Sequence, residues 1–345
     1  MKNITVMGAG GWGIALANLL NGAGHKVALA AYFGEEARLL RDERGNDKLL
    51  PGVRIPDAVE ITDFEGAGGY VRRSDVIVCA SPSPAVGSTV SCVAPYLNEG
   101  QLIVNVSKGL DEKRLLRLSQ VIEDVSRVPR VAVLSGPSHA EELARGVPTT
   151  IVASSRHADV ADRVQDIFMT PVLRVYTNPD IIGVELGGAL KNIIALAVGI
   201  TDGLGLGDNS KAAIMTRGLA EISRLGVAMG ADPFTFSGLS GMGDLVVTCT
   251  SVHSRNRRAG ILLGQGYSAE ETLKSVGMVV EGINTARAAL LLAREYGVEM
   301  PITAEVNNVL FGGLDVKTAV RNLLGRDKKS EISSTLLSHP RTSAL

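Results

Sequence analysis

The chain has 345 residues, of which 45% are hydrophobic and 21% charged, and its formal net charge is −1. This length exceeds the size at which one hydrophobic core usually stops growing, so the sequence predicts two domains. The near-neutral charge argues against nucleic acid as a partner, because phosphate backbones select strongly basic surfaces.

The cysteines and histidines follow no pattern typical of a metal site or a disulfide framework. Cys79, Cys92 and Cys249 are an odd number, widely spaced and without a C-x-x-C pair, and the five histidines share no metal-ligand spacing. We therefore expect free thiols, no bound metal and a reducing compartment, the cytoplasm.

The stretch 4–24 contains no charged residue, a feature that it shares with signal peptides and membrane spans. Its many glycines and two asparagines disfavour the continuous apolar helix that export or membrane insertion needs. We expect no integral membrane segment here, and no later apolar stretch that reaches the roughly 20 residues of a membrane span.

In the first half of the chain, short apolar runs alternate with amphipathic segments. Strands are predicted at 4–7, 27–31, 59–62, 76–80, 102–105, 131–134, 150–153 and 173–176, and helices at 12–20, 85–93, 112–125 and 159–169. Most of the strand runs are continuous Val, Ile and Leu, which is typical of strands covered on both faces. The alternation predicts a Rossmann-type, doubly wound parallel sheet.

The pattern changes after Tyr176. Asn178-Pro179-Asp180 predicts a helix start. Helical patterns follow at 181–201, 209–228, 281–296 and 301–310, with turns at 203–207, 238–243 and 312–313. The predicted fold class is therefore α/β, with a dinucleotide-binding domain over residues 1–180, an all-helical C-terminal substrate and catalytic domain over 181–325, and a polar tail over 326–345 that should fray.

Residues 8–13 read GAGGWG and match the G-x-G-x-x-G fingerprint directly after the first predicted strand. Gly8 permits the tight turn, Gly10 lets a pyrophosphate approach the backbone, and Gly13 lets helix and strand pack closely. The following helix would present its N-terminal amides to the phosphates. This strand–turn–helix context predicts a dinucleotide site.

The fingerprint usually continues with an acidic residue at the end of the second strand, which binds the ribose 2′-OH. Residues 30–34 read AAYFG and contain neither that acid nor an Arg that would accommodate a 2′-phosphate. The sequence therefore predicts no strong preference between NADH and NADPH.

Three polar segments follow predicted strands and should meet at the carboxyl edge of the sheet, where ligands bind in open α/β folds. They are 81–83 (SPS), 107–109 (SKG) and 135–138 (SGPS). A lysine at this edge faces the crevice, so we predict that Lys108 contacts a ligand.

Lys191 lies in the apolar helical pattern 187–197 (GGALKNIIALA). A buried ammonium is costly unless it is partnered, and burial lowers its pKa towards neutrality. Such a lysine can act as a general acid or base. The alternative is a lysine that extends to solvent.

Two segments of the second half carry hydroxyl groups. Residues 237–245 (SGLSGMGDL) resemble a nucleophile elbow at first sight, but the G-x-S-G spacing in a helical domain does not fit a serine hydrolase. Residues 248–257 (TCTSVHSRNR) open a helix and include Arg255. A guanidinium beside a helix N-terminus can bind phosphate, and the alternative is a capped helix with a solvated arginine.

These segments resemble the bacterial NAD(P)-dependent glycerol-3-phosphate dehydrogenase family along nearly the whole chain. The matching segments are GAGGWG (8–13), LLPG (49–52), VNVSKGL (104–110), LSGPSHAEELA (134–144), the block 184–222, LSGMGDLVVTC (239–249), HSRNRRAG (253–260) and VVEGINTA (279–286). The block 184–222 and the SRN segment are specific to this family. The chain departs from the family at Gly11, where Ser is usual, and at the end of the second strand, which lacks the usual Trp and basic residue.

The resemblance implies a set of site residues. Lys191 would be the catalytic proton donor and acceptor. The substrate would be held by Lys108, Gly136, Ser138, Lys191, Asp244, Ser254, Arg255 and Asn256. The cofactor would be held by Gly11, Trp12, Tyr32, Lys108, Ala140, Arg255, Val279 and Glu281, together with the fingerprint residues Gly8, Gly10 and Gly13.

The activity that the resemblance implies is the reversible, NAD(P)H-dependent reduction of dihydroxyacetone phosphate to sn-glycerol 3-phosphate, which supplies glycerophospholipid synthesis. A hydride would pass to C2 while Lys191 donates the proton, Lys108 would lower the pKa of Lys191, and Asp244 would orient both ammonium groups. The partner is then a small-molecule substrate, and a homodimer is left open. Two alternatives stay open: another two-domain dehydrogenase of the β-hydroxyacid or 6-phosphogluconate type, and a non-catalytic nicotinamide-binding sensor.

Overall fold

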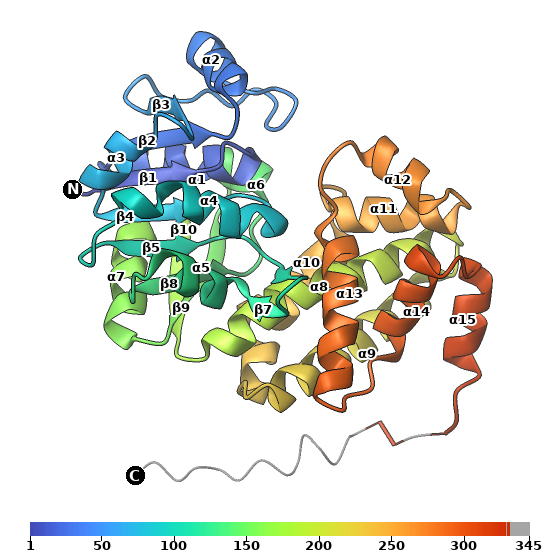
Figure 1. Cartoon of the computed structure of the whole chain (residues 1–345). Coiled ribbons are helices and arrows are strands. Elements are labelled where there is room, and N and C mark those ends of the chain that lie inside the picture. Colours follow the sequence, from blue (N-terminus) through green and yellow to red (C-terminus); the bar gives the residue numbers. More distant parts are fainter. Residues whose placement is uncertain (329, 332–345) are drawn as a thin grey trace, which may run out of the picture.

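The computed structural model describes residues 1–328, 330 and 331, and it consists of a sheet-containing domain beside a helical one (Figure 1). Of the predicted tail 326–345, residues 329 and 332–345 lie outside the described residues. The polypeptide passes from the first domain to the second at α8, which begins at Ile181, where the Asp180 carboxylate accepts a hydrogen bond from the Gly183 amide and caps the helix.

The first domain contains an eight-stranded sheet in the order β10-β9-β8-β5-β4-β1-β2-β3. Its strands are β1 (Asn3–Met7), β2 (Lys26–Ala31), β3 (Glu60–Asp63), β4 (Val76–Cys79), β5 (Leu102–Asn105), β8 (Val131–Ser135), β9 (Thr149–Ser155) and β10 (Leu173–Asn178). All eight predicted strands are present, with ends shifted by at most two residues. Their continuous apolar composition matches their burial on both faces.

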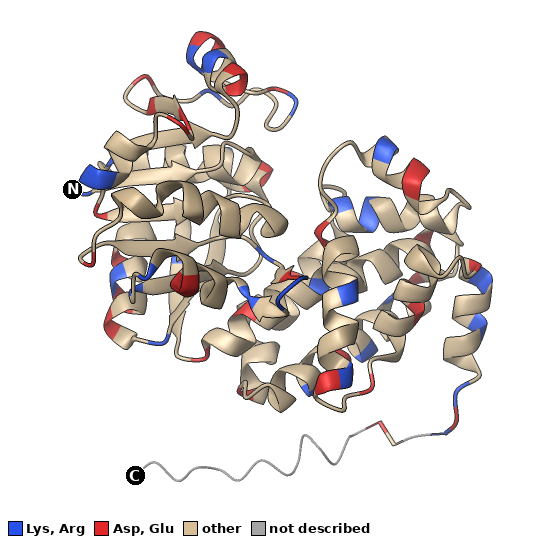
Figure 2. Ribbon diagram, viewed as in Figure 1, with Lys and Arg blue, Asp and Glu red and all other residues tan. Residues whose placement is uncertain are grey.

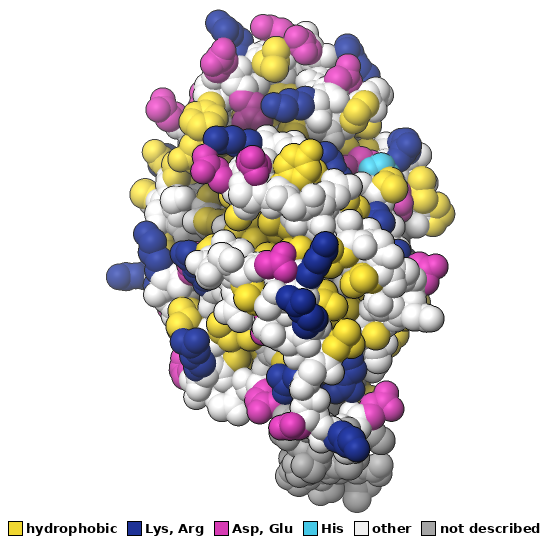
Figure 3. All heavy atoms as spheres, turned by 90° about the vertical axis from the view of Figure 1, so that its right-hand side faces the viewer, with side chains coloured by type: hydrophobic (Ala, Val, Ile, Leu, Met, Phe, Trp, Pro, Cys, Tyr) yellow, Lys and Arg dark blue, Asp and Glu magenta, His cyan; other side chains and the backbone are white. Residues whose placement is uncertain are grey.

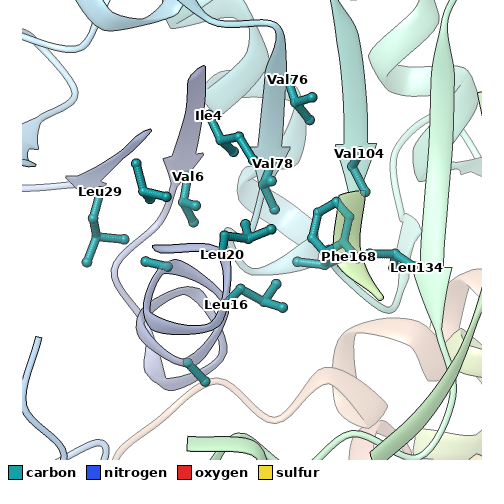
Figure 4. Close-up of a cluster of buried hydrophobic side chains, with 14 of the residues drawn as sticks. Ile4, Val6, Leu16, Leu20, Leu29, Val76, Val78, Val104, Leu134 and Phe168 are labelled. Carbon is teal, nitrogen blue, oxygen red and sulfur yellow. The ribbon is translucent and has the colours of Figure 1, made fainter. Parts of the chain in front are cut away.

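Helices cover both faces of this sheet. They are α1 (Gly11–Gly22), α2 (Gly34–Glu43), α3 (Gly68–Arg73), α4 (Val86–Val93), α5 (Leu118–Ser126), α6 (Ala140–Ala144) and α7 (Ala158–Phe168). On one face, Leu16 and Leu20 of α1 and Phe168 of α7 pack against Val6, Val78 and other strand residues (Figure 4). On the other face, α3, α4 and α5 bury the alternate strand residues, among them Met7 and Cys79. This double layer fixes the strand ends on which the site is built.

The sheet is not wholly parallel, which corrects the prediction. Strand β9 pairs antiparallel with β8, with Ala132 opposite Ser155, whereas the other strand pairs of this sheet are parallel. A parallel crossover needs a connection long enough to carry the chain back along the sheet. The link between β8 and β9 contains only the five-residue helix α6, so the chain turns at the same edge and runs back.

The predicted helix 112–125 is wrong in its first half. Residues Leu110–Asp111 (β6) and Leu116–Arg117 (β7) form a short hairpin, and α5 begins only at Leu118. The Asp111 carboxylate accepts hydrogen bonds from the amides of Lys113 and Arg114, which favours a turn. Leu115 has a φ of 55°, which no α-helix contains.

The second domain is helical, as predicted. Its helices are α8 (Ile181–Gly203), α9 (Gly207–Ala228), α10 (Asp244–Thr250), α11 (Arg255–Gly264), α12 (Ala269–Val276), α13 (Glu281–Glu295), α14 (Pro301–Phe311) and α15 (Val316–Leu324). The predicted turn 238–243 is instead a wide, single-turn π-helix over Leu239–Gly243, directly before α10. Helices α8, α9, α11, α13 and α14 surround one apolar core.

Helix α8 runs through the middle of this domain (Figure 1). The helix has 23 residues and contains an 18-residue window with a mean hydropathy of 1.7. It is therefore long and apolar enough to cross a membrane by length and composition, so the expectation that no such stretch exists is wrong. However, 94% of its most apolar window is buried inside the protein. It also carries Glu185 and Lys191. It is therefore the core helix of the second domain.

Close backbone contact joins α8 to α11. A Cβ on Gly199 would lie 2.2 Å from the Arg257 carbonyl oxygen, and a Cβ on Gly260 would lie 2.2 Å from the Leu196 carbonyl oxygen. Only glycine at both positions lets the two helices approach so closely. This packing places the N-terminus of α11, with Arg255, beside the segment of α8 that carries Lys191.

Candidate active site

The connections that follow β1 and β4 diverge at the carboxyl edge of the sheet. The chain continues from β1 to β2 on one side, while β4 pairs with the other side of β1 and leads to β5. Such a switch point is where open α/β sheets bind ligands. The three predicted edge segments, which follow β4, β5 and β8, all lie at this edge, because these strands are parallel to β1.

The fingerprint residues have the geometry that a dinucleotide requires. Gly8 has a φ of +117°, and a Cβ there would lie 2.7 Å from the Ala80 carbonyl oxygen. A Cβ on Gly13 would lie 1.9 Å from the Gly8 carbonyl oxygen, so helix and turn are in direct contact. A Cβ on Gly10 would meet no described heavy atom within 4 Å, and no described side chain caps α1. The free amides of the helix N-terminus therefore face open space, which fits a pyrophosphate.

Of the other residues predicted to hold the cofactor, one packs against this turn. Ala140, at the start of α6, packs beside Gly11, and Tyr32 is exposed at the end of β2. Val279 accepts a hydrogen bond at its carbonyl oxygen from the Arg255 guanidinium at 3.1 Å. Their contact with a cofactor stays a prediction.

Lys191 is buried in α8, with 5% of its surface exposed. Its Nζ donates to Oδ1 of Asp244 and, at 2.6 Å, to Oγ1 of Thr248. Thr248 in turn donates to the Asp244 backbone carbonyl, one turn earlier in α10. An ammonium has three N–H donors. The third donor of Lys191 has no partner in the described part of the chain, so it is free to meet a substrate.

Lys108 shares the same carboxylate. Its Nζ donates to Oδ2 of Asp244 at 2.7 Å, to the Gly136 carbonyl oxygen at 2.7 Å and to Oγ of Ser138 at 3.0 Å. Asp244 is 1% exposed, so it is a buried anion between two cations. The structure therefore brings together Lys108, Gly136, Ser138, Lys191 and Asp244 from four separate segments of the chain.

The environment of Lys191 brings its titration into the physiological range. Burial lowers the pKa of Lys191 to about 7, the Asp244 carboxylate opposes that decrease, and the positive charge of Lys108 adds to it. The prediction that Lys108 lowers the pKa of Lys191 is confirmed. A lysine with a pKa near 7 can both release and regain a proton at neutral pH.

The Ser-Arg-Asn segment begins α11. Oγ of Ser254 accepts a hydrogen bond from the Arg257 amide and caps the helix. The Asn256 amide is buried, donates to Oδ1 of Asn192 at 2.9 Å and accepts from the Gly282 amide at 2.8 Å. Asn192 follows Lys191 directly, so this pair ties the start of α11 to the lysine. The structure thus shows Ser254 and Asn256 as scaffold residues, and their contact with a phosphate stays a prediction.

A cleft of about 340 Å³ opens between the loop 48–53, α6 and the start of α11. Its charged lining residues are Lys48, Glu141, Arg145, Arg255 and Arg258. Four cations against one anion make this cleft electropositive. Together with the helix N-terminus, it suits an anionic ligand group.

The sequence analysis did not assign Thr248, Asn192 or Ser83 to the site. Thr248 lies four residues after Asp244, which places both side chains on one face of a helix, but no local motif marks it. The Ser83 amide and hydroxyl donate hydrogen bonds to the carboxylate of Glu281, which is 198 residues away. The hydrogen bond from the amide is 3.0 Å long. Such a long-range contact has no local trace in the sequence.

Two family models together span this site. The N-terminal model of NAD-dependent glycerol-3-phosphate dehydrogenase matches residues 3–161, and the C-terminal model matches residues 180–321. The chain belongs to the NAD-dependent glycerol-3-phosphate dehydrogenase family. The resemblance drawn from the sequence is therefore confirmed.

Relatives within the glycerol-3-phosphate dehydrogenase family match the chain from end to end. The NAD(P)+-dependent glycerol-3-phosphate dehydrogenase of Moorella thermoacetica is 54% identical over 334 residues, which cover 96% of this chain and 98% of that protein. That of Bacillus subtilis is 50% identical over 338 residues, 96% of each chain. The crystal structure of glycerol-3-phosphate dehydrogenase from Coxiella burnetii has a TM-score of 0.90 at 36% identity and covers 94% of this chain and 99% of that one.

Proposed function

We propose that the chain reduces dihydroxyacetone phosphate to sn-glycerol 3-phosphate with NADH or NADPH, and that it catalyses the reverse oxidation. The observation that carries this proposal is the Lys108–Asp244–Lys191 cluster, in which Lys191 and Asp244 are buried, together with the dinucleotide turn at the same sheet edge as Lys108 and the electropositive cleft at the start of α11. The product is the backbone from which glycerophospholipids are built, so we propose that the enzyme supplies their synthesis.

The residues divide the chemistry between them. Gly8, Gly10 and the start of α1 would hold the dinucleotide, which would supply a hydride for C2 of the substrate. Lys191 donates the proton to the carbonyl oxygen as negative charge develops there, through the N–H that Asp244 and Thr248 leave free. Asp244 keeps the ammonium oriented, and Lys108 adds a second positive charge near the same oxygen.

The phosphate of the substrate would lie at the other end of the site. Arg255 begins α11 and lines the electropositive cleft, and the Asn192–Asn256 hydrogen bond holds that helix start next to Lys191. Binding energy from the phosphate would therefore position a carbonyl that is only a few bonds away.

We also propose that the enzyme works in a reducing cytoplasm. Cys79, Cys92 and Cys249 are free thiols, and Cys79 and Cys249 are buried. In the face shown in Figure 3, basic and acidic side chains are interspersed and form no single-sign field of the kind that nucleic acid selects. A homodimer stays a prediction, which light scattering of the purified protein tests.

The direct test is substrate-dependent turnover. NAD+ and NADP+ reduction should be followed with sn-glycerol 3-phosphate, 3-hydroxyisobutyrate and 6-phosphogluconate as separate substrates. We expect turnover with sn-glycerol 3-phosphate and less than about 1% of that kcat/KM with the other two, a difference of about 2.7 kcal/mol. Equal or higher turnover with either acid would refute the substrate assignment, and cofactor binding without any turnover would favour a sensor.

A further inference from the structure

Glu281 lies at the start of α13 in the helical domain and reaches across to the turn that follows β4 in the first domain. Its Oε1 accepts a hydrogen bond from the Ser83 amide at 3.0 Å, and its Oε2 accepts one from the Ser83 hydroxyl. The two residues are 198 positions apart, so this contact joins the two domains directly. Both donors of Ser83 point at one carboxylate.

A third residue makes this contact sterically feasible. A Cβ on Gly109 would lie 2.4 Å from both Cβ and Oγ of Ser83, and 3.4 Å from Oε2 of Glu281. A side chain at position 109 would therefore displace the serine from the carboxylate. Gly109 directly follows Lys108, so the Ser83–Glu281 contact lies next to the catalytic cluster.

The location of this contact relates it to the cofactor. Strand β4 pairs with β1 at the switch point, and Ala80, just past the end of β4, touches Gly8 of the dinucleotide turn. Ser83 lies three residues further along the same connection. Glu281 is thus held at the wall of the crevice, on the side of Lys108 and hence of the reacting atoms.

The Glu281 carboxylate retains capacity to bind a ligand. A carboxylate has about four acceptor positions, and Ser83 occupies two of them. Burial raises the pKa of Glu281, whereas the two hydrogen bonds from Ser83 and the positive charge of Arg255 oppose that rise. Ser83 thus favours the charged form of the carboxylate, which accepts hydrogen bonds more strongly than a neutral acid.

We propose that Ser83 is a positioning residue for cofactor binding: with Gly109 beside it, it holds the Glu281 carboxylate at the crevice wall, where the carboxylate accepts hydrogen bonds from the hydroxyls of the ribose next to the nicotinamide. This inference rests on the cofactor role proposed for Glu281. It adds Ser83 and Gly109 to the residues on which cofactor affinity depends.

The test measures cofactor binding without substrate. Trp12, the one Trp of the chain, lies in the dinucleotide turn, and its fluorescence reports the Kd for NADH and NADPH independently of turnover. Ser83→Ala should raise both Kd values by about five- to thirtyfold, because it removes one charge-assisted hydrogen bond that fixes the carboxylate. The KM for dihydroxyacetone phosphate at saturating cofactor should change by less than about twofold, because the substrate contacts are intact.

Two further variants separate positioning from general damage. Ser88→Ala is the matched control, because Ser88 is exposed on α4 and donates to the Ala85 carbonyl oxygen, away from Glu281. It should leave both Kd values within about twofold of the wild type. In a Glu281→Ala background, Ser83→Ala should add less than about twofold, because its effect passes through the carboxylate.

Gly109→Ala provides a second route to the same result. Its methyl group should displace Ser83 and raise the cofactor Kd as Ser83→Ala does, so the proposal stays testable if one variant fails to fold. Kd values unchanged in folded Ser83→Ala, or effects of Ser83→Ala and Glu281→Ala that multiply, would overturn the proposal. If dihydroxyacetone phosphate is not reduced but these Kd shifts occur, the substrate assignment fails and the role of Ser83 stands.

Discussion

At the scale of single residues, the proposed chemistry depends on how two lysines share one buried carboxylate. One carboxylate oxygen of Asp244 accepts a hydrogen bond from Lys191 and the other accepts one from Lys108. The Thr248 hydroxyl oxygen accepts a hydrogen bond from a second N–H of Lys191. A lone buried ammonium would lose its proton, and an isolated ion pair would hold it too tightly for transfer. The combination of burial, one anion and a second cation brings the pKa of Lys191 to about 7.

This balance predicts the pH dependence of turnover. Reduction needs the ammonium form of Lys191, so kcat should fall as pH rises through about 7, and oxidation should rise over the same range. Lys108→Met removes a charge that lowers the pKa of Lys191, so it should move this limb of the pH profile to higher pH. Asp244→Asn should move it to lower pH.

The measurement is kcat from pH 5.5 to 9.5 in both directions. Lys113→Met serves as the control, because Lys113 is exposed in the β6–β7 turn and should leave the limb in place. If neither Lys108→Met nor Asp244→Asn shifts the pH at which kcat changes, a group other than Lys191 controls the rate.

Arg255 tests the phosphate end of the site. Arg255→Ala should raise the KM for dihydroxyacetone phosphate about ten- to a hundredfold, because it removes a charged hydrogen bond. Its effect on unphosphorylated dihydroxyacetone, a much poorer substrate, should be less than about twofold. Steady-state kinetics with both ketones provides the internal control, and equal losses on the two would assign Arg255 another role.

At the scale of elements, α8 connects catalysis to the domain interface. Six residues before Lys191, the buried carboxylate of Glu185 accepts hydrogen bonds from the Arg117 guanidinium and from the amide and hydroxyl of Ser119, at the start of α5. Both members of the ion pair are nearly inaccessible, with 6% and 4% of their side chains exposed. Loss of one member leaves a buried, unpaired charge.

Glu185→Ala should therefore lower the free energy of unfolding by about 3–5 kcal/mol. Urea unfolding monitored by circular dichroism measures this. Glu270→Ala is the control, because Glu270 and Lys274 form an exposed i,i+4 pair whose loss should cost at most about 0.5 kcal/mol. If Glu185→Ala lowers the free energy of unfolding by less than about 1 kcal/mol, water must fill the space of the lost side chain and solvate Arg117.

We expect the elements after β2 to determine the choice of cofactor. Tyr32 and Phe33 follow the strand as exposed aromatics, and α2 carries charges of both signs (Figure 2). Arg38 is exposed on α2, while the Asp63 carboxylate lies beside Gly34 at its start. An acid favours the ribose hydroxyl, and a cation favours a 2′-phosphate.

With both signs present, we expect NADH and NADPH to differ by less than about a hundredfold in kcat/KM. Steady-state kinetics at matched ionic strength measures the ratio. A preference beyond about a thousandfold, roughly 4 kcal/mol, would reveal a dedicated 2′-site. Arg38→Ala should shift the ratio towards NADH.

At the scale of the whole molecule, sequence patterns predicted the elements better than their long-range contacts. The eight strands followed from continuous Val, Ile and Leu, and the burial of Lys191 followed from its apolar neighbours in α8. The β6–β7 hairpin did not, because a side-chain turn at Asp111 and the left-handed Leu115 overrode a helical pattern. The antiparallel β9 also depends on the length of α6, which the residue pattern alone does not set.

In the candidate site, too, the sequence predicted the local segments better than the contacts between them. Lys108, Asp244 and Arg255 lie in local segments that could be recognised one at a time. Their meeting depends on the crossing of α8 with α11 and on the docking of the two domains. Contacts such as Ser83–Glu281 depend on packing between distant segments, which no local pattern encodes.

The role proposed for Lys191 as proton donor is measured by the kcat of Lys191→Ala for dihydroxyacetone phosphate reduction. We predict a fall of about 10²–10⁴ in kcat, with the NADPH Kd from Trp12 fluorescence within about twofold of the wild type, because the variant removes a general acid and leaves the dinucleotide turn intact. A folded Lys191→Ala enzyme that retains more than half of the wild-type kcat would show that another group delivers the proton.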